Sequence, residues 1–143
     1  MLVVDDDHSE MALIGMAIEH SPHNMWLLTA SDGQRAIEYL EGRDSFGDRA
    51  LHPLPDLIVL DLDMALSGGF DFLDWRSASR SFSSIPPAVM SGWAYPGAIE
   101  AALSMGANAS ISKPGQHQDW QTVVDRMWDI GLANYREAAH EGI

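Results

Sequence analysis

Apolar and polar positions follow two different periods along this chain, and the two alternate from one end to the other. Short, mostly apolar runs with the composition of β-strands are Leu2–Val4, Met25–Thr29, Leu57–Leu60, Pro86–Met90 and Ala109–Ser112. After each run, apolar residues recur at the spacing that places them on one face of a helix. These helical segments begin near Ser9, Asp32, Phe70, Pro96 and Trp120. The pattern predicts strands that alternate with helices.

Polar residues and glycines mark where the predicted helices begin and end. Ser9 is the expected N-cap of the first helix, and Asp32 that of the second. Gly68 and Gly69 are expected to break the chain before the third helix. Gly106 is expected to cap the end of the fourth helix.

The alternation predicts an α/β fold, namely a doubly wound, five-stranded parallel sheet flanked by five helices. The continuous apolar run Leu57–Leu60 is typical of a strand that is covered on both faces. The 143 residues suffice for one domain. We place it at residues 1–132, with residues 133–143 as a C-terminal helix extension or tail. Ligands of such sheets bind beyond the carboxyl ends of the strands.

Composition narrows the classes of function. The formal net charge is −13 with only eight Lys and Arg, which argues against nucleic acid as a partner because phosphate backbones are bound by basic clusters. The sequence has no Cys, which excludes disulfides and thiolate metal sites. No apolar stretch approaches the roughly 20 residues of a membrane helix, and the first residues lack a signal-peptide pattern. We expect a cytoplasmic protein without membrane contact.

Reactive polar side chains stand at the predicted carboxyl ends of four strands. They are Asp5, Asp6 and Asp7 after the first strand, Asp61 and Asp63 after the third, Ser91 after the fourth and Lys113 after the fifth. Each alone is a weak signal, since acidic residues are also typical of a helix start and Ser or Lys of a turn. Because the carboxyl ends of parallel strands meet at one edge of a sheet, we expect these side chains to share one pocket.

The chemistry of this set favours phosphoryl transfer. Two carboxylates about 4 Å apart repel by roughly 4 kcal/mol at an effective dielectric constant of about 20, so the acids predict a cation. Oxygen ligands suit Mg²⁺ or Mn²⁺. A carboxylate can accept a phosphoryl group covalently, provided that positive charge neutralises the phosphoryl oxygens. We expect Asp61 to attack, the metal and Lys113 to offset charge, and Ser91 to hydrogen-bond a phosphoryl oxygen.

Four segments, residues 3–7, 56–64, 85–92 and 112–114, resemble the receiver domains of two-component response regulators, and the likeness extends over about residues 2–130. The resemblance implies a flavodoxin-like or CheY-like fold. It also implies that Asp61 is the phosphorylation site, that Ser91 is the switch residue and that Lys113 is the functional lysine. It further implies a metal site, formed by Asp5, Asp6, Asp61 and the backbone carbonyl of Asp63.

Three positions depart from the family pattern. Ala65 stands where the family commonly has Pro and Gly68 where it often has Asp, which should loosen the loop after Asp61. Ser110 stands where many members carry an aromatic switch residue, so we expect activation to be read in another way. As a hypothesis, the acidic Asp63 changes how water approaches the acyl phosphate; an unchanged phosphoryl lifetime in Asp63→Asn would contradict it.

The resemblance also implies partners. A sensor histidine kinase would donate the phosphoryl group, and the long loop before Asp56 is similar to that of single-domain regulators of bacterial phytochrome-type kinases. We see no output domain and expect the signal to pass by contact with a downstream protein. A homodimer through the face of the fourth helix, fifth strand and fifth helix is expected, because Trp120 and Trp128 lie in the last helix. Trp93 either overhangs the pocket or packs on the adjacent helix.

Two other functions compete with this interpretation. Asp61 and Asp63 also form the DxD pattern of haloacid-dehalogenase-type phosphatases, with Ser91 and Lys113 in the following roles. Those enzymes usually place their metal-binding acids after the lysine, whereas here the acids precede it. The second alternative is a degenerate receiver that docks partners without being phosphorylated. We expect no enzyme activity beyond self-phosphorylation and self-dephosphorylation.

Overall fold

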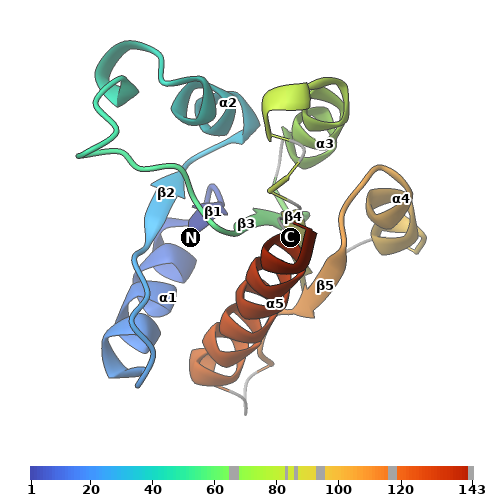
Figure 1. Cartoon of the computed structure of the whole chain (residues 1–143). Coiled ribbons are helices and arrows are strands. Elements are labelled where there is room, and N and C mark those ends of the chain that lie inside the picture. Colours follow the sequence, from blue (N-terminus) through green and yellow to red (C-terminus); the bar gives the residue numbers. More distant parts are fainter. Residues whose placement is uncertain (65–67, 83, 86, 93–95, 116–118, 142–143) are drawn as a thin grey trace.

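The computed structural model describes residues 1–64, 68–82, 84–85, 87–92, 96–115 and 119–141. It confirms the predicted fold, since a five-stranded sheet is flanked by helices on both faces (Figure 1). The strands are β1 (Leu2–Val4), β2 (Leu28–Ala30), β3 (Ile58–Asp61), β4 (Pro87–Ser91) and β5 (Ala109–Ser112). All pairs are parallel, and the spatial order is β2-β1-β3-β4-β5.

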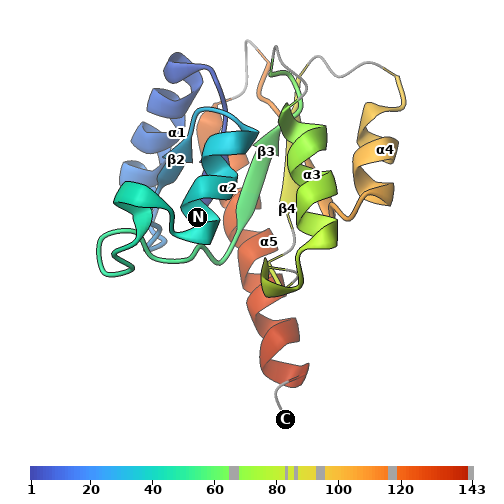
Figure 2. The same ribbon diagram turned by 90° about the horizontal axis from the view of Figure 1, so that it is seen from above.

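The helices form two layers. They are α1 (His8–His20), α2 (Gly33–Glu41), α3 (Gly68–Ala78), α4 (Ala98–Ser104) and α5 (Trp120–Glu141), with short 3-10 turns η1 (Asp44–Phe46) and η2 (Arg80–Phe82). Buried residues of α1 and α5 pack on one face of the sheet, and those of α2, α3 and α4 on the other (Figure 1). The end of α5 projects beyond the other elements (Figure 2). Among the described residues, no helix combines the length and the apolar character needed to cross a membrane.

The strand order places a crevice between β1 and β3. From the central β1 the chain moves outward to β2, then returns past β1 to β3 and continues to β4 and β5. The connections therefore leave β1 and β3 in opposite directions, and this topological switch point is where such sheets bind ligands. Asp5 directly follows β1 and Asp61 ends β3, so both carboxylates stand at this crevice.

The α1 N-cap differs from the prediction. Asp7, not Ser9, caps the helix: its Oδ1 accepts hydrogen bonds from the backbone N–H groups of Ser9 (2.9 Å) and Glu10 (3.1 Å). The helix therefore starts at His8. Asp7 and Ser9 are both good N-cap residues. Because β1 already ends at Val4, the helix can begin after the earlier of the two, Asp7.

Two other boundaries also differ. The second strand was predicted from Met25 but begins at Leu28, because Leu28 pairs with Leu2, where β1 begins, and residues 25–27 lie beyond that end of β1. Gly68 and Gly69 were predicted to break the chain, but they form the first turn of α3. The backbones of Gly68 and Gly33 approach so closely that a Cβ at Gly33 would collide with the Gly68 carbonyl, so the glycines here allow two helix starts to touch.

The remaining predicted boundaries agree more closely with the structure. Asp32 caps α2 by accepting a hydrogen bond from the Arg35 N–H (2.7 Å). Gly106 follows α4 with φ +108°, and the N–H of Ala107 bonds to the Ala102 carbonyl, which is the pattern of a Schellman motif. Helix α5 continues without interruption past residue 132. The division of the chain at that residue stays a prediction.

Candidate functional site

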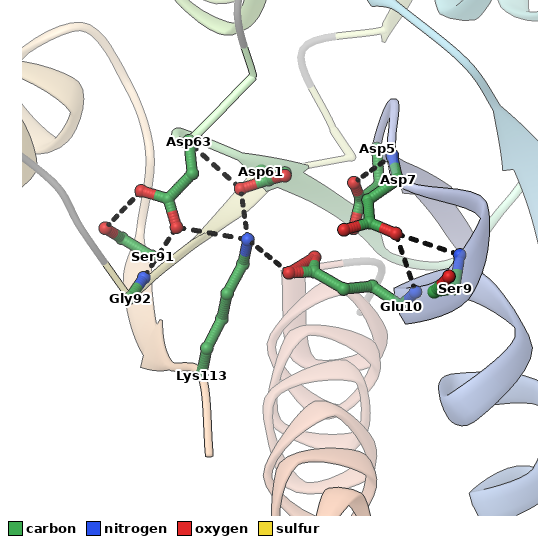
Figure 3. Close-up of polar contacts among 9 residues, drawn as sticks. All are labelled: Asp5, Asp7, Ser9, Glu10, Asp61, Asp63, Ser91, Gly92 and Lys113. Atoms are coloured by element: carbon green, nitrogen blue, oxygen red, sulfur yellow. Dashed lines mark hydrogen bonds and ion pairs between the residues drawn. The ribbon is translucent and has the colours of Figure 1, made fainter. Parts of the chain in front are cut away.

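The carboxyl ends of the strands bring together the side chains that the sequence singled out (Figure 3). Asp61 is 2% exposed at the end of β3, and Asp5 is 1% exposed after β1. Ser91 ends β4 and Lys113 follows β5. Residues separated by more than 100 positions thus meet in one pocket, as the parallel topology requires.

Lys113 is the electrostatic centre of this pocket. Its Nζ lies 2.9 Å from Glu10 Oε1, 3.0 Å from Asp61 Oδ1 and 3.0 Å from Asp63 Oδ2 (Figure 3). Burial alone lowers the pKa of the Lys113 ammonium. The three carboxylates outweigh burial and raise this pKa above its ordinary value. Lys113 therefore carries a fixed positive charge beside Asp61.

Asp5, Asp6 and Asp61 each offer a carboxylate oxygen, and these oxygens lie within 4.8 Å of one another. Burial and the neighbouring carboxylates of Glu10 and Asp61 raise the pKa of Asp5 to about 8, although the Asp7 amide opposes the shift. Within the described part of the chain, Asp5 Oδ2 is buried without a hydrogen-bond partner. Converging oxygens and an uncompensated buried carboxylate are what a hard divalent cation would satisfy, so the residues fit such an ion.

The Asp63 side chain folds back toward β4 instead of facing solvent. Its own N–H donates to Asp61 Oδ1 (2.8 Å), which holds the two residues in a tight turn. Its carboxylate accepts hydrogen bonds from Ser91 Oγ (3.1 Å) and from the Gly92 N–H (2.7 Å). Burial raises the pKa of Asp63, but the Gly92 amide, Lys113 and Ser91 outweigh it and hold this pKa below its usual value. Asp63 is therefore anionic.

Glu10 is the site residue that the sequence did not indicate. It lies in the first turn of α1, and its Oε2 is buried without a partner among the described residues. One signal was available: with Asp7 as the N-cap, Glu10 stands at the third helical position, one turn beyond Asp5 and Asp6. The prediction of Ser9 as the N-cap put Glu10 at the first helical position and so did not indicate its place beside the acids.

Other predicted residues lie away from the pocket or outside the described residues. Asp7 is occupied with capping α1, and its N–H donates to Asp5 Oδ1 (2.9 Å). Trp93, like Ala65, lies outside the described residues. Trp128 stacks on His23 with ring centroids 4.4 Å apart, and it lines a cavity of about 550 Å³ at the opposite end of the sheet.

The chain is similar to response regulators in both sequence and fold. The sequence-family model of the response regulator receiver domain matches residues 1–125. The two-component response regulator ORR4 of Oryza sativa subsp. indica is 32% identical over 137 residues, which are 89% of this chain and 58% of that protein. The chain thus spans about three fifths of the length of that relative.

Two solved structures have the same fold. A response regulator in red light signalling of R. palustris superimposes with a TM-score of 0.80 at 24% identity, covering 89% of each chain. The phosphorylated cyanobacterial phytochrome response regulator RcpA superimposes with a TM-score of 0.70 at 23% identity, covering 91% of this chain and 86% of the other. Together with the family match, the fold and the acidic crevice lead to one conclusion: this chain belongs to the response regulator receiver domain family.

Proposed function

We propose that Asp61 is the residue of this receiver domain that accepts the phosphoryl group. One observation carries the proposal: the buried Asp61 carboxylate shares the pocket with two further acids on one side and with the Lys113 ammonium, 3.0 Å away, on the other. This arrangement provides a nucleophile together with the positive charge that phosphoryl transfer requires.

The metal-binding residues in this proposal are Asp5, Asp6 and Asp61, with the backbone carbonyl of Asp63 as a further ligand. Receiver domains bind a divalent cation, and the donor set here consists of oxygens, which favours Mg²⁺ or Mn²⁺. When bound, the ion supplies positive charge to the phosphoryl oxygens.

The chain's own residues have separate tasks in the transfer. An Asp61 oxygen attacks the phosphorus of a phosphohistidine, the P–N bond breaks, and the imidazole leaves with the electron pair and takes up a proton. Lys113 offsets the charge of the equatorial oxygens from its fixed position. Ser91 donates its hydroxyl to one of these oxygens, and this change of partner is the switch that biases the face formed by α4, β5 and α5.

A sensor histidine kinase is the proposed phosphoryl donor. The likeness to regulators of red-light and phytochrome signalling supports a phytochrome-type kinase, and the long segment 42–55 before β3, in which η1 is the helical turn, agrees with it. We further propose a cytoplasmic location, a downstream protein as the target and no catalysis beyond the domain's own phosphorylation and dephosphorylation.

A homodimer through α4, β5 and α5 stays a proposal, on altered grounds. Trp128 packs on His23 beside α1, so it does not support this interface. Leu103 of α4, which is 41% exposed, does support it. The exposed Ser110 of β5 leaves this face without an aromatic switch residue.

Mass spectrometry after incubation with acetyl phosphate and Mg²⁺ tests the proposed acceptor. We expect an adduct of about 80 Da that is lost in Asp61→Asn and kept in Asp129→Asn, which removes the same charge from an exposed position of α5. Omission of Mg²⁺ should also abolish the adduct.

The same assay separates the alternatives. Rapid turnover of aryl phosphates would indicate the phosphatase, which the family match does not favour. Neither adduct nor turnover would indicate a docking module that is not phosphorylated.

A further inference from the structure

The Asp63 carboxylate contacts Ser91 and Lys113, the two groups that the proposed function assigns to the phosphoryl group, and it also accepts from the Gly92 N–H. Ser91 Oγ donates to Asp63 Oδ1, and both the Gly92 N–H and the Lys113 ammonium contact Asp63 Oδ2 (Figure 3). Both oxygens of the side chain are therefore engaged, by donors from the ends of two different strands. The Asp63 side chain is only 11% exposed, so these contacts are shielded from water.

We propose that Asp63 acts as an internal stand-in for the phosphoryl group. It holds Ser91, Gly92 and Lys113 in the unphosphorylated domain and must leave them when Asp61 is phosphorylated. This inference rests on the proposed function of Asp61. It assigns to the Asp63 side chain a role in positioning the phosphoryl-binding donors, separate from that of its backbone carbonyl.

The chemistry of the contacts makes the role specific to an acid at this position. A carboxylate presents two anionic acceptors, as a phosphoryl group does with its equatorial oxygens. An asparagine would offer one neutral acceptor and an N–H₂ donor, which cannot serve all three donors at once. The backbone fixes the location as well, because the Asp63 N–H is bonded to Asp61 Oδ1 at 2.8 Å and so keeps the two side chains adjacent.

Competition follows from charge. A phosphoryl group on Asp61 brings close to two negative charges to donors that already hold an anion. Ser91 has one hydroxyl hydrogen to donate, so the two anions compete for it, and repulsion between like charges in a shielded pocket weakens any sharing of Lys113. Phosphorylation therefore exchanges one acceptor for another at Ser91, and the domain loses its contacts to Asp63 in return.

Calorimetric titration with beryllofluoride in the presence of Mg²⁺ measures this competition. The proteins are the wild type, Asp63→Asn, Asp63→Ala and, as the control of equal charge change, Asp129→Asn. We expect both Asp63 variants to bind beryllofluoride about fivefold or more tightly than the wild type, and the control to differ by less than about twofold. Thermal unfolding of each variant confirms that it is folded.

The outcomes separate this inference from the proposed function. A wild type that does not bind beryllofluoride, or binding that persists in Asp61→Asn, overturns the proposed function and this inference with it. Wild-type binding with equal or weaker binding by folded Asp63 variants overturns this inference alone.

A crystal structure of the wild type with Mg²⁺ and beryllofluoride gives a second test that requires no folded variant. We expect the Asp63 carboxylate to have turned away, with Ser91 and Lys113 on the fluorines. An Asp63 that still accepts from Ser91 and Gly92 in that complex would refute the stand-in.

Discussion

Single residues in the pocket perform two tasks at once, one in folding and one in chemistry. Lys113 attracts three carboxylates that would otherwise repel one another, and it is also the cation placed to offset the charge of a phosphoryl group. Asp5 has no such partner, since its Oδ2 is buried and, among the described residues, receives no hydrogen bond. At the scale of the residue, the domain without its ion therefore avoids an unfavourable charge at Asp5 by keeping this side chain protonated up to about pH 8.

The raised pKa of Asp5 predicts how stability without a divalent cation depends on pH. Its pKa is about 8 in the folded domain and near its ordinary value of 3.8 in the unfolded chain, so between these values the folded state binds more protons. The free energy of unfolding should therefore fall as pH rises from about 4 to about 8. Chemical denaturation in a chelator checks this fall, which Asp5→Asn should reduce.

The same group predicts the pH dependence of metal binding. Because a cation needs the ionised carboxylate, Mg²⁺ must displace the Asp5 proton below pH 8, and its apparent affinity should rise by up to about tenfold per pH unit between pH 6 and 8. Titration with Mg²⁺ at several pH values measures this slope. An affinity that is independent of pH over this range would contradict the shift.

Caps and close approaches at the ends of elements decide how the pocket is assembled. The sequence indicated the strands and most helices, because their apolar periods are long and regular. It did not indicate which of two good caps begins α1, since Asp7 and Ser9 are equally suitable and the choice depends on where β1 ends. Because the helix begins after Asp7, two residues earlier than predicted, Glu10 lies in its first turn and reaches the pocket.

Side-chain placement beyond the strand ends was also not predictable from the sequence. The positions of Asp5, Asp61, Ser91 and Lys113 follow from topology, so the pattern of strands was enough to bring them together. The return of the Asp63 side chain to β4 depends on contacts with Ser91, Gly92 and Lys113, which no residue pattern specifies.

The cap of α1 is testable at the scale of the element. Asp7→Ala removes the acceptor of two backbone N–H groups and should lower the free energy of unfolding by about 1 kcal/mol, measured by urea denaturation. Ser9→Ala is the control. Its side chain is not the cap, so we expect a change within about 0.5 kcal/mol, and a larger loss in Ser9→Ala than in Asp7→Ala would return the cap to Ser9.

At the scale of the whole molecule, several exposed apolar side chains could join copies of the chain, and two of them distinguish opposite ends of the sheet. Leu103 is on α4, within the proposed dimer face, and Trp26 is 70% exposed beside the cavity at the other end of the sheet. Because a buried, unpaired charge is costly in an interface, a glutamate at the true contact should dissociate the dimer.

Sedimentation velocity with Mg²⁺ and beryllofluoride identifies the contact. We expect a wild-type dimer, a monomer for Leu103→Glu and an unchanged dimer for Trp26→Glu. A monomeric wild type would refute the homodimer, and dissociation by Trp26→Glu in place of Leu103→Glu would move the interface to the opposite end of the sheet.

The ratio of charges around Lys113 has a consequence for the order of events. Among the described residues, Glu10, Asp61 and Asp63 contact the Lys113 ammonium, and Asp5 and Asp6 add two further acidic groups beside Asp61, so without a cation the crevice repels an anionic donor. We therefore expect the divalent ion to bind before the donor and to lower this barrier. The concentration of that ion in the cell then controls whether the domain can react with a phosphorylated partner.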